Sequence, residues 1–158
     1  MLISMELTKP ESFAKQIALF FNNGDFQRAY ELAQELIVKF PDEMLAHFLL
    51  AQAAYRIGRF EDAKMEGRKA FNIASEVDDM IGCALITASA YYSLGEYQKG
   101  YELLEEMEKK KSTEEIQSAL MIFSLAMENP KEAILHLEKL YGLNKQLAMD
   151  MAAKMLEE

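Results

Sequence analysis

Residues that commonly carry catalysis are few in this sequence and lie far apart. The two histidines are His47 and His136, and the single cysteine is Cys83. Cys83 has no cysteine neighbour that would complete a metal or redox motif. The sequence contains no glycine-rich phosphate loop and no nucleophile elbow. We therefore predict that the protein is not an enzyme and has no cofactor and no metal site.

The acidic pairs and one of the histidines have structural explanations instead. Asp78-Asp79 and Glu114-Glu115 fall where helices are expected to begin, and carboxylates are stabilised there by the helix dipole. His47 falls on a packing face of its expected helix, so we interpret it as a core histidine with satisfied ring nitrogens. None of these residues indicates a site of chemistry.

The charge balance argues against two classes of partner. The chain has 158 residues, is 51% hydrophobic and carries a formal net charge of −9, whereas nucleic acids and anionic membranes are bound by clustered Lys and Arg. The only basic run, Lys109–Lys111, lies near an expected helix C-terminus, where cations suit the dipole. The longest uncharged stretch, Met80–Leu94, is shorter than the ~20 apolar residues that span a bilayer. We predict no nucleic-acid partner and no membrane insertion.

The expected compartment follows from the cysteine count and the first residues. A lone Cys83 cannot form an intrachain disulfide, which favours a reducing compartment. Residues 1–6 have neither the basic flank nor the apolar length of a signal peptide. We therefore predict a cytoplasmic protein.

A short pattern recurs along the chain and defines the elements. Gly24-Asp25-Phe26-x-x-Ala29 is followed 34 residues later by Gly58-Arg59-Phe60-x-x-Ala63, and a third copy, Gly95-Glu96-Tyr97-x-x-Gly100, comes 37 residues after that. A period in this range indicates a stack of helix pairs, in which no pair can bury its apolar face without its neighbours. Such stacks bind other proteins.

Apolar spacing is helical almost throughout. The expected helices are 10–23, a second one from Phe26 that Pro41 stops, then 42–57, 60–75, 79–94, 97–110, 114–127, 131–141 and a last one from 144 to about 156.

Local residues mark where several of these helices end or begin. Asn129-Pro130 replaces the glycine turn in the fourth pair, Gly142 is expected as a C-cap, and Asn144 is expected as an N-cap. We interpret the Met-rich last helix as a cap on the stack. The alternative is a mobile methionine surface that grips partners.

These residues resemble the tetratricopeptide repeat family. The matching positions, by repeat, are Gly24, Phe26, Ala29 and Pro41; Ala51, Gly58, Phe60, Ala63 and Ala70; Ala88, Tyr91, Gly95 and Tyr97; and Ala133 and Leu140. No repeat has the family's tryptophan. About three residues are inserted around 75–79, and we expect them to lengthen the connection there.

The resemblance implies an all-α fold. We expect an alpha-alpha superhelix (a solenoid) of about four helix pairs plus a C-terminal capping helix, forming a single domain over residues 1–158. The expected repeats are 10–43, 44–80, 81–113 and 114–141, with the capping helix at 144–157.

In this family the first helix of each pair lines a concave groove. These helices carry a second apolar stripe beyond the one needed for packing, and such a surplus usually indicates a binding surface. The predicted groove residues are Phe21, Asn22, Phe48, Gln52, Tyr55, Leu85, Ser89, Tyr92, Ile122 and Leu125. Four of them hold one equivalent place in successive repeats and should form a column: Phe21, Tyr55, Tyr92 and Leu125.

One subclass of the family is excluded by residue type. Domains that hold the acidic tails of heat-shock chaperones clamp carboxylates with Lys, Asn and Arg. The corresponding positions here cannot donate a side-chain hydrogen bond: Ala14, Ala18, Leu49, Gly82 and Ile86.

The leading hypothesis is a non-catalytic protein-interaction scaffold or adaptor that binds a partner's apolar peptide or helix. An alternative is a small chaperone that shields an apolar client segment, because the chain is similar to type III secretion chaperones in size and repeat number. A regulatory sensor for a small peptide ranks lower. The groove could instead be filled by the protein's own N-terminal tail, its last helix or a second copy, so self-association is also possible.

Overall fold

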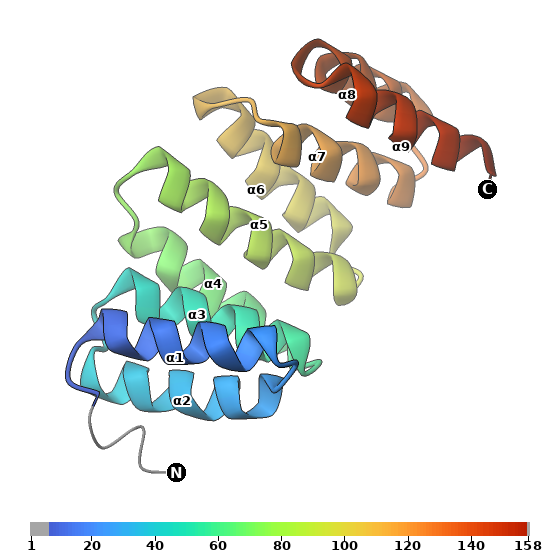
Figure 1. Cartoon of the computed structure of the whole chain (residues 1–158). Coiled ribbons are helices and arrows are strands. Elements are labelled where there is room, and N and C mark those ends of the chain that lie inside the picture. The colour runs from blue at the N-terminus through green and yellow to red at the C-terminus, as the bar shows by residue number, and fades with distance from the viewer. Residues whose placement is uncertain (1–6, 158) are drawn as a thin grey trace. The chain divides into compact units, whose positions relative to one another are not determined.

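A computed structural model describes residues 7–157, and this part of the chain contains nine α-helices and no strand (Figure 1). In chain order they are α1 (Pro10–Asn22), α2 (Phe26–Lys39), α3 (Met44–Arg56), α4 (Phe60–Ile73), α5 (Val77–Ser93), α6 (Tyr97–Lys110), α7 (Glu114–Ala126), α8 (Pro130–Leu143) and α9 (Lys145–Glu157). The predicted all-α class is confirmed.

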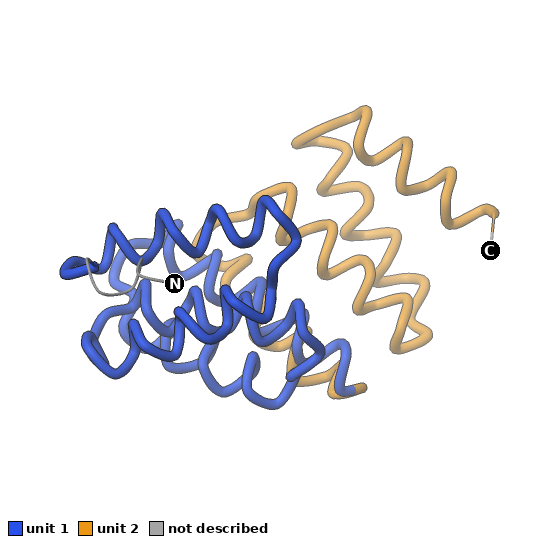
Figure 2. Tube along the Cα trace, turned by 60° about the horizontal axis from the view of Figure 1, so that its bottom comes forward, with its two compact units in different colours: residues 1–94 blue, residues 95–158 orange. Residues whose placement is uncertain are grey.

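The chain divides into two compact units, residues 1–94 and 95–158 (Figure 2). Unit 1 contains α1 to α5, and unit 2 contains α6 to α9. The division falls just before Gly95, inside the expected third repeat. The assignment of residues 1–158 to a single domain stays a prediction.

Each helix pair of unit 1 is closed by a left-handed turn residue. Gly24 and Gly58 have φ of +73° and +83°, a region that L side chains rarely adopt. After these turns, the N–H of Asp25 and the N–H of Arg59 donate at 2.8 Å to carbonyls five residues earlier. This bonding satisfies carbonyls at the end of the first helix and turns the chain back on itself.

The fourth pair keeps the turn without the glycine. Glu128 takes φ of +56°, and the N–H of Asn129 donates to the Ser124 carbonyl at 2.8 Å, as in the other turns. The Asn129 side chain caps α8 by accepting from the Glu132 N–H at 3.3 Å. Pro130 then opens the helix, where its missing N–H costs nothing.

Within unit 1 each helix packs against the next, from α1 through α5, and α3 also contacts α1 and α5 directly. Its core is a cluster of buried apolar side chains with several alanines at the close helix contacts. Ala29 and Ala63, which hold the same position of the repeated pattern, are fully buried. Unit 2 is built likewise, with α6 on α7, α7 on α8 and α8 on α9.

Two details of the sequence prediction are wrong. The extra residues around 75–79 do not lengthen a connection, because only residues 74–76 separate α4 from α5; they lengthen α5, which has 17 residues where α1 and α3 have 13. Gly142 does not end its helix, since α8 continues to Leu143 and its C-cap is Asn144. Asn144 does cap α9, accepting from the Leu147 N–H at 3.0 Å.

A close contact between α4 and α5 in unit 1 generates a prediction. A Cβ on Gly67 would overlap the Thr87 hydroxyl, which is itself buried and bonded to the Cys83 carbonyl. Gly67→Ala should therefore lower the free energy of unfolding by about 1–3 kcal/mol, the usual cost of overpacking, measured by urea denaturation.

The matched control is Gly142→Ala, also in a helix but with open space around the added methyl. It should be neutral or stabilising by up to about 1 kcal/mol. Adding Thr87→Ala to Gly67→Ala should recover part of the loss. Equal stability of Gly67→Ala and the wild-type protein would mean that α4 and α5 are not this close.

Candidate functional site

His47 lies in the core and ties three segments of unit 1 together. Its Nδ1 is 2.6 Å from Glu66 Oε2 on α4, and its Nε2 is 2.6 Å from the Pro41 carbonyl. The other Glu66 oxygen accepts from Lys69 at 3.3 Å. The interpretation of His47 as a satisfied core histidine is confirmed.

His136 is buried in a hydrogen-bonded network of unit 2. Its Nδ1 lies 2.8 Å from the Gln117 side-chain oxygen, and its Nε2 lies 3.0 Å from the Tyr101 hydroxyl. Because a carbonyl oxygen only accepts, Nδ1 carries a proton, and the neutral ring can accept from Tyr101 at Nε2. The network extends from the Gln117 amide to Glu108 at 2.6 Å.

The pKa values in this network follow from burial and from these partners. Burial lowers the pKa of His136, against the opposing pull of the Glu108 and Glu132 charges. Burial, followed by the Glu132 charge, raises the pKa of Tyr101 to about 12. For Glu108 burial acts upward, but the hydrogen bonds from Gln117 and Lys139 outweigh it, so its pKa is lowered. The network therefore favours a neutral His136 beside an ionised Glu108.

The lowered pKa of His136 predicts how unit 2 responds to acid. The unfolded chain binds a proton on this residue at a higher pH than the folded chain does, so the contribution of His136 is complete above the ordinary histidine pKa and is lost as the pH falls below it. The difference in urea midpoint between the wild-type protein and His136→Gln should shrink from pH 7.5 to pH 5.5. A difference that grows on acidification would contradict a neutral His136.

Cys83 is the only thiol, and its surroundings make it inert. It is fully buried in α5, with its sulfur 3.7 Å from the sulfur of Met44. Burial, and to a smaller extent the charge of Asp79, raises the pKa of the Cys83 thiol to about 11. Residues 7–157 contain no group of three or more side chains that could hold a metal ion.

Because the thiolate is the reactive species, native protein at pH 8 should react with Ellman's reagent far more slowly than protein in 6 M guanidinium chloride. A native rate near that of a free cysteine would show that the thiol is accessible.

The exposed faces of the first helices of each pair carry almost no charge. From Met44 to Tyr55 of α3 and from Met80 to Ser93 of α5 there is no Asp, Glu, Lys or Arg. The paired helix α4, in contrast, carries charges along its length, including the ion pair of Lys64 with Glu61 at 3.0 Å. A helix face that meets water is usually polar, so these faces are candidates for a partner's contact.

In unit 1 the predicted groove residues are all exposed or half-buried, and none belongs to the fully buried core. The aromatic ones are supported from behind. Phe21 packs on Phe26 and Tyr55 on Phe60, each with ring centres 5.4 Å apart. These four residues repeat one arrangement, in which a first-helix aromatic rests on the aromatic that follows the turn.

The C-terminal ends of α3 and α5 contact each other on the side that carries the predicted groove residues. The Ser93 hydroxyl donates to the Tyr55 hydroxyl at 3.5 Å, and Tyr92 is 39% exposed. The Phe48 ring would lie 3.7 Å from a Cβ at Gly82 of α5, so Phe48 spans the two helices. Ser89 is less available, because its hydroxyl already donates to the Leu85 carbonyl at 2.9 Å.

Polar groups at this face are few. Asn22 is exposed at the end of α1, and Gln52 is half-buried on α3. Arg56 is the last residue of α3, and its guanidinium carbon lies 4.1 Å from the centre of the Phe26 ring. The face therefore offers apolar area with a few groups that can set direction.

Ile122 and Leu125 lie on α7 of unit 2, with exposed fractions of 42% and 36%. Their place in a column with Phe21, Tyr55 and Tyr92 stays a prediction. The sequence reasoning missed Met149 and Leu156 of α9, which are 53% and 89% exposed. The signal that identifies them is the Asn144 cap, from which the phase of α9 can be counted.

Residues 15–64 match the family model described as the tetratricopeptide repeat. The predicted resemblance to the tetratricopeptide repeat (TPR) family is thus confirmed over these residues. Proteins of this family are in general non-catalytic scaffolds. No curated protein matches the sequence.

Solved structures extend the likeness of the fold beyond the residues of the family model. TTC0263, a thermophilic TPR protein of Thermus thermophilus, is similar with a TM-score of 0.80 and 20% identity, covering 98% of this chain and 85% of that one. MamA of Desulfovibrio magneticus RS-1 gives 0.76 and 17%, covering 87% and 77%. The Cut9–Hcn1 hetero-tetramer of the APC/C gives 0.81 and 17%, covering 94% of this chain but 30% of that one. These likenesses confirm the predicted TPR fold class.

Over residues 7–157, none of the helices combines the length and the apolar character needed to cross a membrane.

Proposed function

We propose that the uncharged face of α1, α3 and α5 in unit 1 binds an apolar peptide or helix of a protein partner, and that the chain acts as an interaction scaffold or adaptor. The observation that supports this is the combination of half-exposed aromatic and aliphatic side chains with an absence of charge along α3 and α5. The cytoplasm is the compartment we expect for it.

The partner chemistry follows from the lining of this face. Phe48, Tyr55 and Tyr92 provide flat apolar area with hydroxyls at one end, and aromatic residues of this kind dominate the energy of many interfaces. Gln52 can bond a partner's backbone or amide. An apolar helix, placing residues three and four apart against the face, fits such a surface.

The stacking of Phe21 on Phe26 and of Tyr55 on Phe60 supports a preformed site. Rings that are held in place lose little side-chain freedom on binding, so more of the contact energy remains as affinity. The similar Cut9–Hcn1 structure is a hetero-tetramer of the APC/C, which supports a role within an assembly.

The alternative is a chaperone that shields an apolar client segment, and it would use the same face. Co-purification distinguishes the two, since a scaffold retains one stoichiometric partner whereas a chaperone captures varied unfolded clients.

The proposal predicts a separation of binding from folding. Tyr55→Ala combined with Tyr92→Ala should weaken a partner by about 30-fold or more, because loss of aromatic hot spots commonly costs about 2 kcal/mol or more. The partner is identified by pull-down from the native host with mass spectrometry, and its affinity for each variant is measured by calorimetry.

The matched control is Tyr141→Ala, an exposed tyrosine on α8 of unit 2, which should leave the affinity unchanged. Thermal melting of the double variant should stay close to that of the wild-type protein. Collapse of the fold without a separable binding defect would instead favour a groove filled by the protein itself.

A further inference from the structure

The last helix has the phase of a groove-lining helix. Helices α3, α7 and α9 begin after the cap residues Glu43, Thr113 and Asn144. On α3 the residues five, nine and twelve positions after Glu43 are Phe48, Gln52 and Tyr55, all predicted groove residues. On α7 the same positions after Thr113 are Ser118, Ile122 and Leu125, which lie on one face of that helix. The same count from Asn144 reaches Met149, Ala153 and Leu156.

Burial supports this count. The residue four beyond each cap is buried in all three helices: His47, Gln117 and Ala148. On α9 the three residues that correspond to groove positions are exposed. The packing face and the groove face of α9 therefore follow the pattern of α3 and α7.

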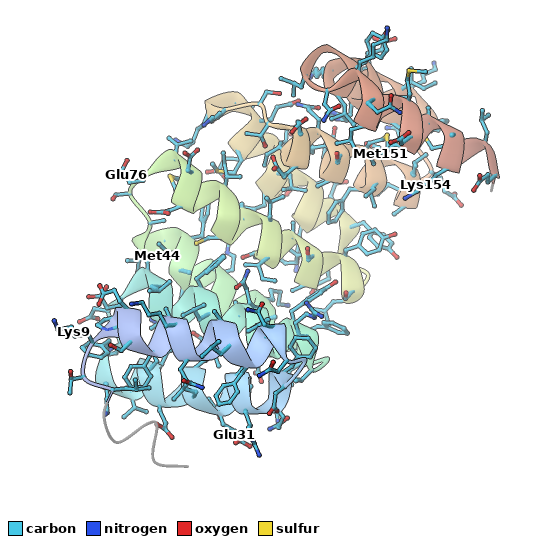
Figure 3. The ribbon with its side chains drawn as sticks, viewed as in Figure 1. Lys9, Glu31, Met44, Glu76, Met151 and Lys154 are labelled. Atoms are coloured by element: carbon cyan, nitrogen blue, oxygen red, sulfur yellow. The ribbon has the colours of Figure 1, made fainter. Side chains whose placement is uncertain are left out.

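One position distinguishes α9 from α3 and α7. Ten residues beyond the cap residue, Ala53 of α3 and Phe123 of α7 are buried, but α9 has the exposed Lys154, labelled in Figure 3. A charge at this position is typical of a helix face that meets water. The charge at Lys154 does not extend to the positions that correspond to groove residues, because Met149 and Leu156 are apolar.

We propose that α7 and α9 form a second recognition face in unit 2, which binds an amphipathic helix with an apolar stripe and a basic flank. The contact residues are Ile122 and Leu125 of α7 with Met149 and Leu156 of α9, two helices that both pack on α8. This inference rests on the proposed use of first-helix faces for binding.

The chemistry of the partner follows from the charges beside this stripe. Asp150 and Glu157 are exposed on the flank of α9 next to Ala153, and Asp150 is held by the Gln146 amide at 2.9 Å. On the other flank, Lys145 lies over the Tyr141 ring. An acidic flank beside apolar side chains complements a basic amphipathic helix, and flexible methionines adapt to such partners.

The test uses the full chain and a fluorescein-labelled 14-residue helical peptide of Leu and Lys, with anisotropy at physiological salt. Met149→Ala combined with Leu156→Ala should weaken binding by about tenfold or more, since two contacts of the apolar stripe are lost. Asp150→Asn combined with Glu157→Gln should weaken it by a smaller factor. Lys154→Ala, at the position that corresponds to the buried Ala53 and Phe123, should not weaken binding. A Leu/Glu peptide should bind poorly.

The variant set separates this inference from the proposed function. If the peptide binds and only Tyr55→Ala with Tyr92→Ala removes the binding, the unit 1 face is used and the α9 inference is wrong. Absence of binding by the wild-type protein, or an unchanged affinity of the α9 pair, also overturns it. Light scattering tests whether a second copy of the chain occupies this face. If the wild-type protein is a dimer and Met149→Ala with Leu156→Ala dissociates it, the face belongs to a second copy and the basic-helix proposal is wrong.

Discussion

Every helix pair depends on one residue that turns the backbone into the left-handed region. At Gly24, Gly58 and Gly95 the missing Cβ removes the usual steric penalty. Glu128 adopts the same φ region with a side chain, at a cost of roughly 1–2 kcal/mol. The Asn129 cap and the Pro130 start offset that cost, since both favour the helix that follows. Within each unit the turn fixes the antiparallel pairing of the two helices that it joins, and with it the phase of their packed faces.

Once the phase is fixed, equivalent positions receive equivalent contacts with different chemistry. In the second and fourth pairs, the residue eleven positions before the left-handed turn residue contacts the residue eight positions after it. In the second pair His47 hydrogen-bonds Glu66, and in the fourth pair Gln117 hydrogen-bonds His136. The corresponding residues of the first pair, Phe13 and Leu32, are buried and apolar. A buried hydrogen-bonded pair is satisfied in only one alignment of its two helices, so these polar contacts favour the correct register where apolar contacts alone tolerate slippage. The chain's histidines thus serve packing.

Local signals predicted the fold well because the residues that determine each repeat lie within a few positions of one another. The glycine turns and the Asn144 cap each act on their own neighbours, and each was predicted correctly. The extra residues around 75–79 were assigned to a loop because sequence spacing does not say whether they belong to a loop or to a helix. In the structure they extend α5 at its N-terminal end. The prediction for Gly142 was wrong because a glycine ends a helix only where the backbone turns left-handed, and the packing of α8 carries the helix past it.

The faces of the groove were harder to predict than the fold. Periodicity separates a packing face from the remainder of a helix, yet it does not say how much of the remainder neighbouring side chains cover. The Ser89 hydroxyl donates to a carbonyl of its own helix, and Phe48 is partly covered by α5 at Gly82. The exposed fraction of Tyr92, in contrast, is 39%. For α9, the interpretation as a cap treated the whole Met-rich helix as a packing surface. It therefore missed Met149 and Leu156, which are exposed. Phase counted from a cap residue would have separated the two sets.

The distribution of charge opposes non-specific association through the apolar faces. Charges lie along the second helices, where ion pairs such as Arg59 with Asp62 at 3.2 Å cover the outer surface, and the formal net charge of −9 makes copies of the chain repel one another. Helices α3 and α5 keep their charges at their ends, as with Asp78 and Asp79 at the start of α5, where the dipole stabilises them. Long-range repulsion therefore opposes non-specific association while the uncharged faces remain open to a partner of matching shape. Affinity at those faces must then come from fitted apolar contact, and selectivity from the few polar groups at their edges.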